Sequence, residues 1–151
     1  MASLGVRSQV GRCRYEVVGT DLLNAESDLE KLAEQLRAGT VKDVKTLDVK
    51  FAHIDRALAH HHLLLVKAVI QRPRADNIPT AARDLDRLAY HFERSFTYSG
   101  QKPSPEQAQA IADAQKLSKE IETTNAIPGT AGPALALIEK QVVAAEVAAT
   151  P

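Results

Sequence analysis

Histidine is the residue type in this chain best suited to chemistry, because imidazole binds metal ions and exchanges protons near neutral pH. Four of the five histidines lie between Leu47 and Gln71, at positions 53, 60, 61 and 62, and the fifth is His91. One helix holds a metal ion with ligands three or four residues apart, and no two of these histidines have that spacing. A metal site would therefore join two helices, through His60, His61 and His91.

The usual metal and haem signatures are missing around these histidines. No acidic residue precedes a histidine by three, so the Glu-x-x-His pattern of di-iron bundles is absent, and so is HExxH. Covalent haem is excluded because the chain has one cysteine, Cys13, and no CxxCH. We expect no cofactor; the alternative is a metal ion or non-covalent haem b held by histidines of two helices.

Each histidine also has a structural interpretation. His61 falls on an apolar seam, where a buried histidine bonded to a neighbouring helix is expected. His53, His60 and His91 flank the seam, which predicts solvated or helix-bridging roles, and His62 is expected at its boundary. A buried His61 loses its proton readily, so acid is expected to loosen the fold.

Histidine phosphotransfer domains resemble this chain in architecture only, with a histidine on a helical bundle. Their motif places lysine and glycine closely after the histidine, whereas here His62 is followed by three leucines. GxGxxG, GxxxxGK[ST] and GxSxG are also absent. The regularly spaced Glu26, Glu30 and Glu34 are typical of a solvated helix face. The sequence therefore favours a protein that is not an enzyme.

The histidine-rich stretch Leu47 to Gln71 is expected to be the longest helix. Its apolar residues recur at steps of three and four, which places them on one stripe: Leu47, Phe51, Ile54, Leu58, His61, Leu65 and Ala68. Charged residues fall outside that stripe. Pro73 ends the pattern, and either Thr40 or Thr46 could begin it.

Four further helices follow from the same periodicity. They are expected at about 20–37, 80–99, 105–122 and 133–148. The apolar seam of the first is Leu22, Ala25, Leu29, Leu32 and Leu36, and that of the second is Ala82, Leu85, Ala89, Phe92 and Phe96. The third has Ala110, Ala114, Leu117 and Ile121, and the fourth has Leu135, Ile138, Val142 and Ala145. Gly39 and Gly100 suit helix ends. Ser104, Pro105 and Gln107 form a capping box.

These elements predict an all-α fold, an antiparallel up-and-down bundle of four helices plus a short C-terminal fifth helix. The fifth either completes the bundle or packs across one face. We expect one domain over 20–151, preceded by a flexible basic tail over 1–19. The compartment stays open: a lone cysteine permits the cytoplasm, and the basic, acid-free first fifteen residues have the composition of an organelle import signal.

Charge and composition exclude some classes of partner. The chain has 19 basic and 19 acidic side chains and few aromatic residues, which argues against nucleic acid. No run of about 18 apolar residues exists, so no transmembrane segment is expected. The favoured function is helix-mediated protein association, with itself or with another protein. Expected contact surfaces are the Ala110 and Ala114 seam and the Leu135 to Ala145 stripe.

Two expected helices also share a short pattern. At an offset of 31, Asp55, Arg56 and His60 align with Asp86, Arg87 and His91. Chance on exposed helix faces is one explanation. The other is a pair of helices related by a pseudo-twofold axis, with two equivalent faces of Asp, Arg and His.

Overall fold

The computed structural model describes residues 20–40 and 44–149, and every regular element in these ranges is a helix. The five helices are α2 (Thr20–Arg37), α3 (Val44–Gln71), α4 (Ile78–Ser99), α5 (Pro105–Thr124) and α6 (Ala131–Ala149). The predicted all-α, up-and-down architecture is confirmed. The expected tail over 1–19 lies outside the described residues.

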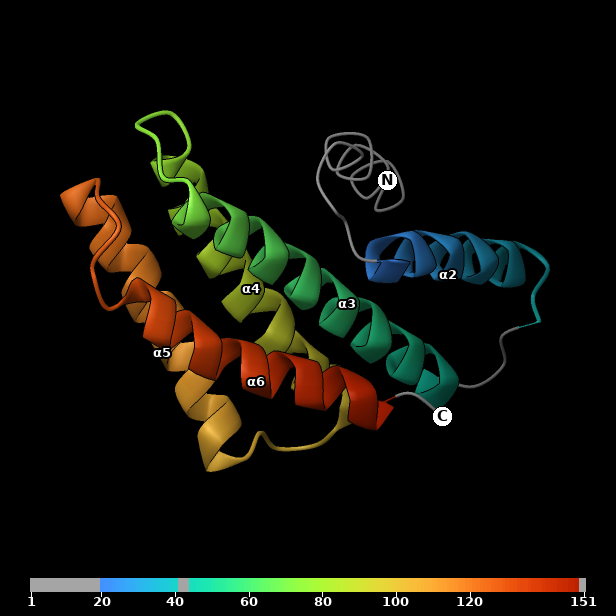
Figure 1. Cartoon of the computed structure of the whole chain (residues 1–151). Helices are drawn as coiled ribbons and strands as arrows, with labels where there is room; N and C mark the ends of the chain where they lie inside the picture. The colour runs from blue at the N-terminus through green and yellow to red at the C-terminus, as the bar shows by residue number, and fades with distance from the viewer. Residues whose placement is uncertain (1–19, 41–43, 150–151) are drawn as a thin grey trace.

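Four of the helices form a closed ring (Figure 1). Helix α3 packs against α4, α4 against α5, α5 against α6, and α6 returns to α3. The C-terminal helix therefore docks and completes the bundle. Helix α2 packs against α3 outside this ring.

Local sequence signals set the ends of several helices. Ser104 accepts a hydrogen bond from the Gln107 backbone N–H at 3.1 Å, and the Gln107 side chain accepts from the Ser104 N–H at 2.8 Å, which confirms the capping box. Gly100 ends α4 with φ 69°, a left-handed conformation that costs glycine little. Helix α5 ends similarly at Asn125, with φ 50°.

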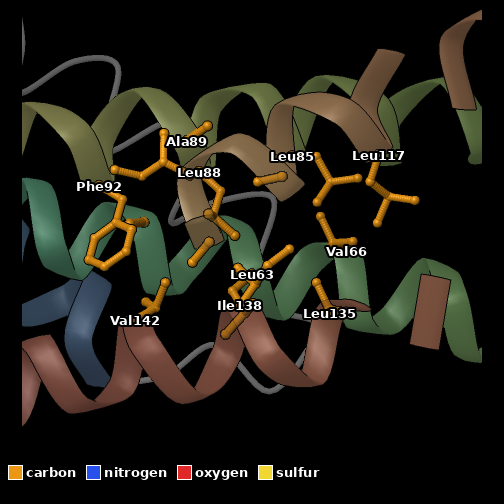
Figure 2. Close-up of a cluster of buried hydrophobic side chains, with 14 of the residues drawn as sticks. Leu63, Val66, Leu85, Leu88, Ala89, Phe92, Leu117, Leu135, Ile138 and Val142 are labelled. Atoms are coloured by element: carbon orange, nitrogen blue, oxygen red, sulfur yellow. The ribbon is translucent and has the colours of Figure 1, made fainter. Parts of the chain in front are cut away.

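The apolar core lies between all four helices of the ring (Figure 2). The predicted seams of α4, α5 and α6 are confirmed, because every one of their residues is buried. Figure 2 shows side chains of the four helices meeting in one layer, among them Leu63 and Val66 of α3, Leu88 and Phe92 of α4, Leu117 of α5, and Ile138 and Val142 of α6.

The buried face of α3 is broader than the predicted stripe. Ile54, Leu58 and His61 are buried as expected, but Ala68 is exposed. Because α3 contacts α2, α4 and α6, the buried region covers several faces of the helix. The residues of α3 with no exposed surface are Ala59, Leu63 and Val66. No helix in the described ranges is both long and apolar enough to cross a membrane.

Candidate functional site

Two of the three histidines predicted as ligands contact carboxylates of different helices. His60 on α3 contacts Glu146 of α6, with Nδ1 and Oε2 2.6 Å apart. His91 on α4 contacts Asp55 of α3, with Nδ1 and Oδ1 2.8 Å apart. His61 is buried, as expected from its place on the seam. His60 and His91 therefore bridge helices, one of the two roles predicted for them.

His53 bridges helices as well, but loosely. Its Nε2 lies 3.8 Å from the Asp28 carboxylate of α2, and both side chains are about one-third exposed. This contact is more exposed than those of His60 and His91. His53 can therefore serve as an exposed control for the more buried histidines.

A second Asp and His pair lies beside that of Asp55 and His91. It is formed by two residues that were not predicted as site residues. His62 on α3 and Asp84 on α4 are 3.0 Å apart between Nδ1 and Oδ1. The two pairs are reciprocal: α3 supplies Asp55 to His91, and α4 supplies Asp84 to His62. We call these four residues the Asp–His quartet.

The two imidazoles of the quartet lie against each other. The rings of His62 and His91 are 5.7 Å apart between centroids and inclined by only 5°. The His61 ring is 5.2 Å from that of His62. Three histidines from two helices therefore form one cluster, in which His62 contacts Asp84 and His91 contacts Asp55.

Burial controls the protonation of the innermost histidines. His62 is only 1% exposed, and this burial lowers its pKa from 6.5 although Asp84 opposes the shift. Burial likewise lowers the pKa of His61 to about 4, with the neighbouring His62 acting in the same direction. Both imidazoles are therefore neutral at physiological pH.

A neutral His62 beside a carboxylate has a defined hydrogen-bonding state. The Nδ1–H group donates to Asp84, which leaves Nε2 with a lone pair and no proton. Within the described residues, this buried Nε2 atom has no hydrogen-bond partner. It is therefore available as a proton acceptor or as a ligand.

The Asp55 carboxylate also connects the quartet to the surface of α4. Its second oxygen, Oδ2, lies 3.6 Å from Nε of Arg94. The guanidinium of Arg94 donates at 2.6 Å to the hydroxyl groups of Tyr90 and Tyr98 and lies over both rings. These hydrogen bonds, first that to Tyr98, raise the pKa of Arg94. Charge and aromatic surface are thus held together on one face.

The quartet meets only part of the requirement for a metal centre. A carboxylate that fixes the Nδ1–H of a histidine is a common support for metal-binding imidazoles. However, among residues 20–40 and 44–149 no three His, Cys, Asp or Glu side chains are grouped so that they could hold a metal ion. Proton binding and helix bridging are the chemistry that this arrangement supports directly.

The two surfaces predicted to contact a partner lie in the core of the bundle. Ala110 and Ala114 are buried, as are Leu135, Ile138 and Ala145, because α5 and α6 turn these stripes into the core. The prediction that they contact a partner is therefore wrong. Any association must use residues that the bundle leaves outside.

The offset of 31 between α3 and α4 does not describe how the residues pair. Asp86 and Arg87 are exposed, whereas Asp55 and Arg56 are buried, so these residues do not form equivalent faces. The structural correspondence is an offset of 29, which relates Asp55 to Asp84 and His62 to His91. An Asp followed seven residues later by a His, in both helices, is the signal that could have revealed the quartet.

Comparison with known proteins gives no relative for this chain: no family model, no curated protein and no solved structure matches it.

Proposed function

We propose that this protein is a non-enzymatic helical bundle that associates with a second copy of itself through the outer face of α4. This face points away from the core and follows the steps of three and four expected for one side of a helix. Its residues, all exposed, are Arg83, Asp86, Arg87, Tyr90, Glu93 and Thr97.

The observation that carries the proposal is the symmetry of charge on this face. If two copies of α4 pack antiparallel with Tyr90 at the twofold axis, Arg87 lies opposite Glu93 of the second copy. In the same register, Asp86 lies opposite Arg94. Opposite charges thus meet on both sides of the axis, which is what a self-complementary interface needs. A parallel arrangement would set like charges against each other.

Three charged residues of this face have no competing ion pair, whereas Arg94 already lies 3.6 Å from Asp55. Within the described residues, Asp86, Arg87 and Glu93 form no ion pair. A second copy could therefore engage them without breaking an existing ion pair, which lowers the cost of association.

The centre of the face is already ordered. Tyr90 is 53% exposed, and its hydroxyl accepts a 2.6 Å hydrogen bond from Arg94. Tyrosine and arginine are enriched among the residues that contribute most to protein interfaces. A side chain held in place before binding loses less conformational entropy on association. Tyr90 is thus suited to the middle of the contact.

The size of the face predicts a weak dimer. At about 1.5 Å per residue, Arg83 to Thr97 spans about 21 Å. A single-helix face of this length is small compared with the interfaces of permanent dimers. We therefore expect association to depend on protein concentration and, because charges contribute, to weaken as salt increases.

Charge-reversal variants test the proposed pairing by sedimentation velocity. The wild-type sedimentation coefficient should rise with concentration. Arg87→Glu places acid opposite Glu93, and Glu93→Arg places base opposite Arg87, so each variant alone should remain monomeric. An equimolar mixture of the two restores both pairs and should form a heterodimer, and the Arg87→Glu, Glu93→Arg double variant should dimerise.

Leu137→Glu provides the matched control, because Leu137 is an exposed residue of α6, away from this face. It should associate as the wild type does. A wild-type protein that stays monomeric at all concentrations contradicts the proposal. So does a mixture of the two single variants that shows no association.

Metal or haem binding through histidines of α3 and α4 is the alternative function. The unpartnered Nε2 of His62 favours it, since a ligand atom of this kind faces no competing donor among the described residues. Metal analysis and an absorption spectrum of the purified protein discriminate the two functions. Stoichiometric metal or a Soret band that is lost in His60→Ala and His91→Ala would favour the alternative.

A further inference from the structure

The Asp–His quartet connects α3 and α4 at two levels. Asp55 and His62 are seven residues apart on α3, and Asp84 and His91 are seven apart on α4. At about 1.5 Å per residue, the two levels are about 10.5 Å apart along the helices. Two cross-links at this separation fix both the register and the rotation of one helix against the other.

Charged and titratable groups surround His62 on the helix that faces it. From α4 these are Asp84, His91 and the more distant Arg87, which disfavours a positive His62. From its own helix, His61 lies next to it. Among the described residues, the acid in hydrogen-bond contact with His62 is Asp84, so a proton added to His62 would gain from that pair and lose from burial and from the nearby His91 and Arg87.

Arg56, beside Asp55 on α3, is buried with its guanidinium 6.0 Å from the centroid of the Phe96 ring. The acids that α2 and α6 place along α3 are engaged elsewhere. On the α6 side, Glu146 contacts His60, and Glu139 bonds to Lys67 at 2.8 Å. On the α2 side, Asp28 lies near His53. These acids pair with other side chains of α3, so the balance of charge at the quartet is set chiefly between α3 and α4.

His91 differs from His62 because its surroundings are more open. Its side chain is 19% exposed, and Asp55, its acceptor, also lies 3.6 Å from Arg94. A proton on His62 would place a positive charge against the parallel ring of His91, whose centroid is 5.7 Å away.

We propose that the Asp–His quartet is an acid-sensitive clasp between α3 and α4. In the neutral state each imidazole donates its Nδ1–H to a carboxylate of the opposite helix. In acid, protonation of the buried His62 places a cation inside the bundle against the parallel ring of His91, and α3 and α4 loosen. This role is independent of association through the outer face of α4.

The direction of the pH effect follows from burial. His62 has a lower pKa in the folded protein than in the unfolded chain, because burial disfavours its charged form. The unfolded chain therefore binds more protons in acid. The contribution of His62 to stability is complete above pH 6.5 and is lost as the pH falls below it.

Urea unfolding between pH 7.5 and 4.5 tests the clasp on the full chain. His62→Gln keeps an amide donor for Asp84 but cannot take up a proton. Below pH 6.5, the wild-type unfolding constant should rise by up to about tenfold per pH unit more than that of His62→Gln. His53→Gln, a change at the exposed histidine of the same helix, should retain the wild-type pH dependence. Equal pH dependence in the wild type and His62→Gln would overturn the proposal.

Two measurements on the wild type keep the test decisive if His62→Gln does not fold. In an NMR titration, the His62 ring should take up its proton at a pH below 6.5. Amide hydrogen exchange, corrected for the intrinsic effect of pH, should show protection falling in α3 and α4 before α5. A His62 ring that takes up its proton at or above pH 6.5, or earliest loss of protection in α5, would contradict an acid-sensitive clasp.

Discussion

At the scale of single residues, burial and contact partners separate histidines that look alike in the sequence. His60, His61 and His62 are consecutive, yet His60 bridges to α6, His62 bonds to Asp84 of α4, and His61 is enclosed between them. Burial lowers the pKa of both His61 and His62. Proximity in sequence therefore says little about which partner a histidine contacts.

His61 gives the largest expected pH effect of a single residue. Burial lowers its pKa from 6.5 to about 4, so its contribution to stability is present above pH 6.5 and lost as the pH falls towards 4. Replacing it with leucine removes this titration. Between pH 7 and pH 5, the wild-type free energy of unfolding should fall by about 2 kcal/mol more than that of His61→Leu. Chemical unfolding at the two pH values measures this difference. If the wild type and His61→Leu lose the same free energy of unfolding, burial does not lower the pKa of His61.

At the scale of helices, the sequence predicts most of what can be read from one helix at a time. The seams of α4, α5 and α6 are all buried, and the capping box at Ser104 is formed, because periodicity and capping depend on residues close in sequence. The Asp–His quartet depends on the register and rotation of α3 against α4. A single stripe could not predict it, since α3 is covered by three helices and buries His62 and Asp55 outside that stripe.

Neighbouring positions on α6 test the assignment of its buried face. Ile138 has no exposed surface, whereas Leu137 is 64% exposed. Ile138→Ala removes buried volume and should lower the free energy of unfolding by about 2 to 5 kcal/mol. Leu137→Ala should change it by less than about 0.5 kcal/mol. Thermal or urea unfolding of the two variants measures both effects. Similar losses would mean that α6 does not dock as described.

At the scale of the whole molecule, the core and the surface have separate roles. Helix α6 closes the ring of four helices, so the apolar stripes that the sequence offers as contact surfaces are used within one chain. The charged face of α4 around Tyr90 is one of the surfaces that remain outside, next to Arg94, whose Nε lies 3.6 Å from Asp55. The quartet is the polar centre of the contact between α3 and α4.

The tautomers of His62 and His91 test this centre most directly. Nitrogen-15 NMR of histidine-labelled protein at pH 7.5 distinguishes neutral rings protonated at Nδ1 from those protonated at Nε2. Because each Nδ1 lies within 3.0 Å of an aspartate oxygen, both rings should carry the proton on Nδ1. Asp84→Asn should change the signals of His62 more than those of His53. Rings protonated at Nε2 alone, or a response to Asp84→Asn confined to His53, would contradict the reciprocal pairing of α3 and α4.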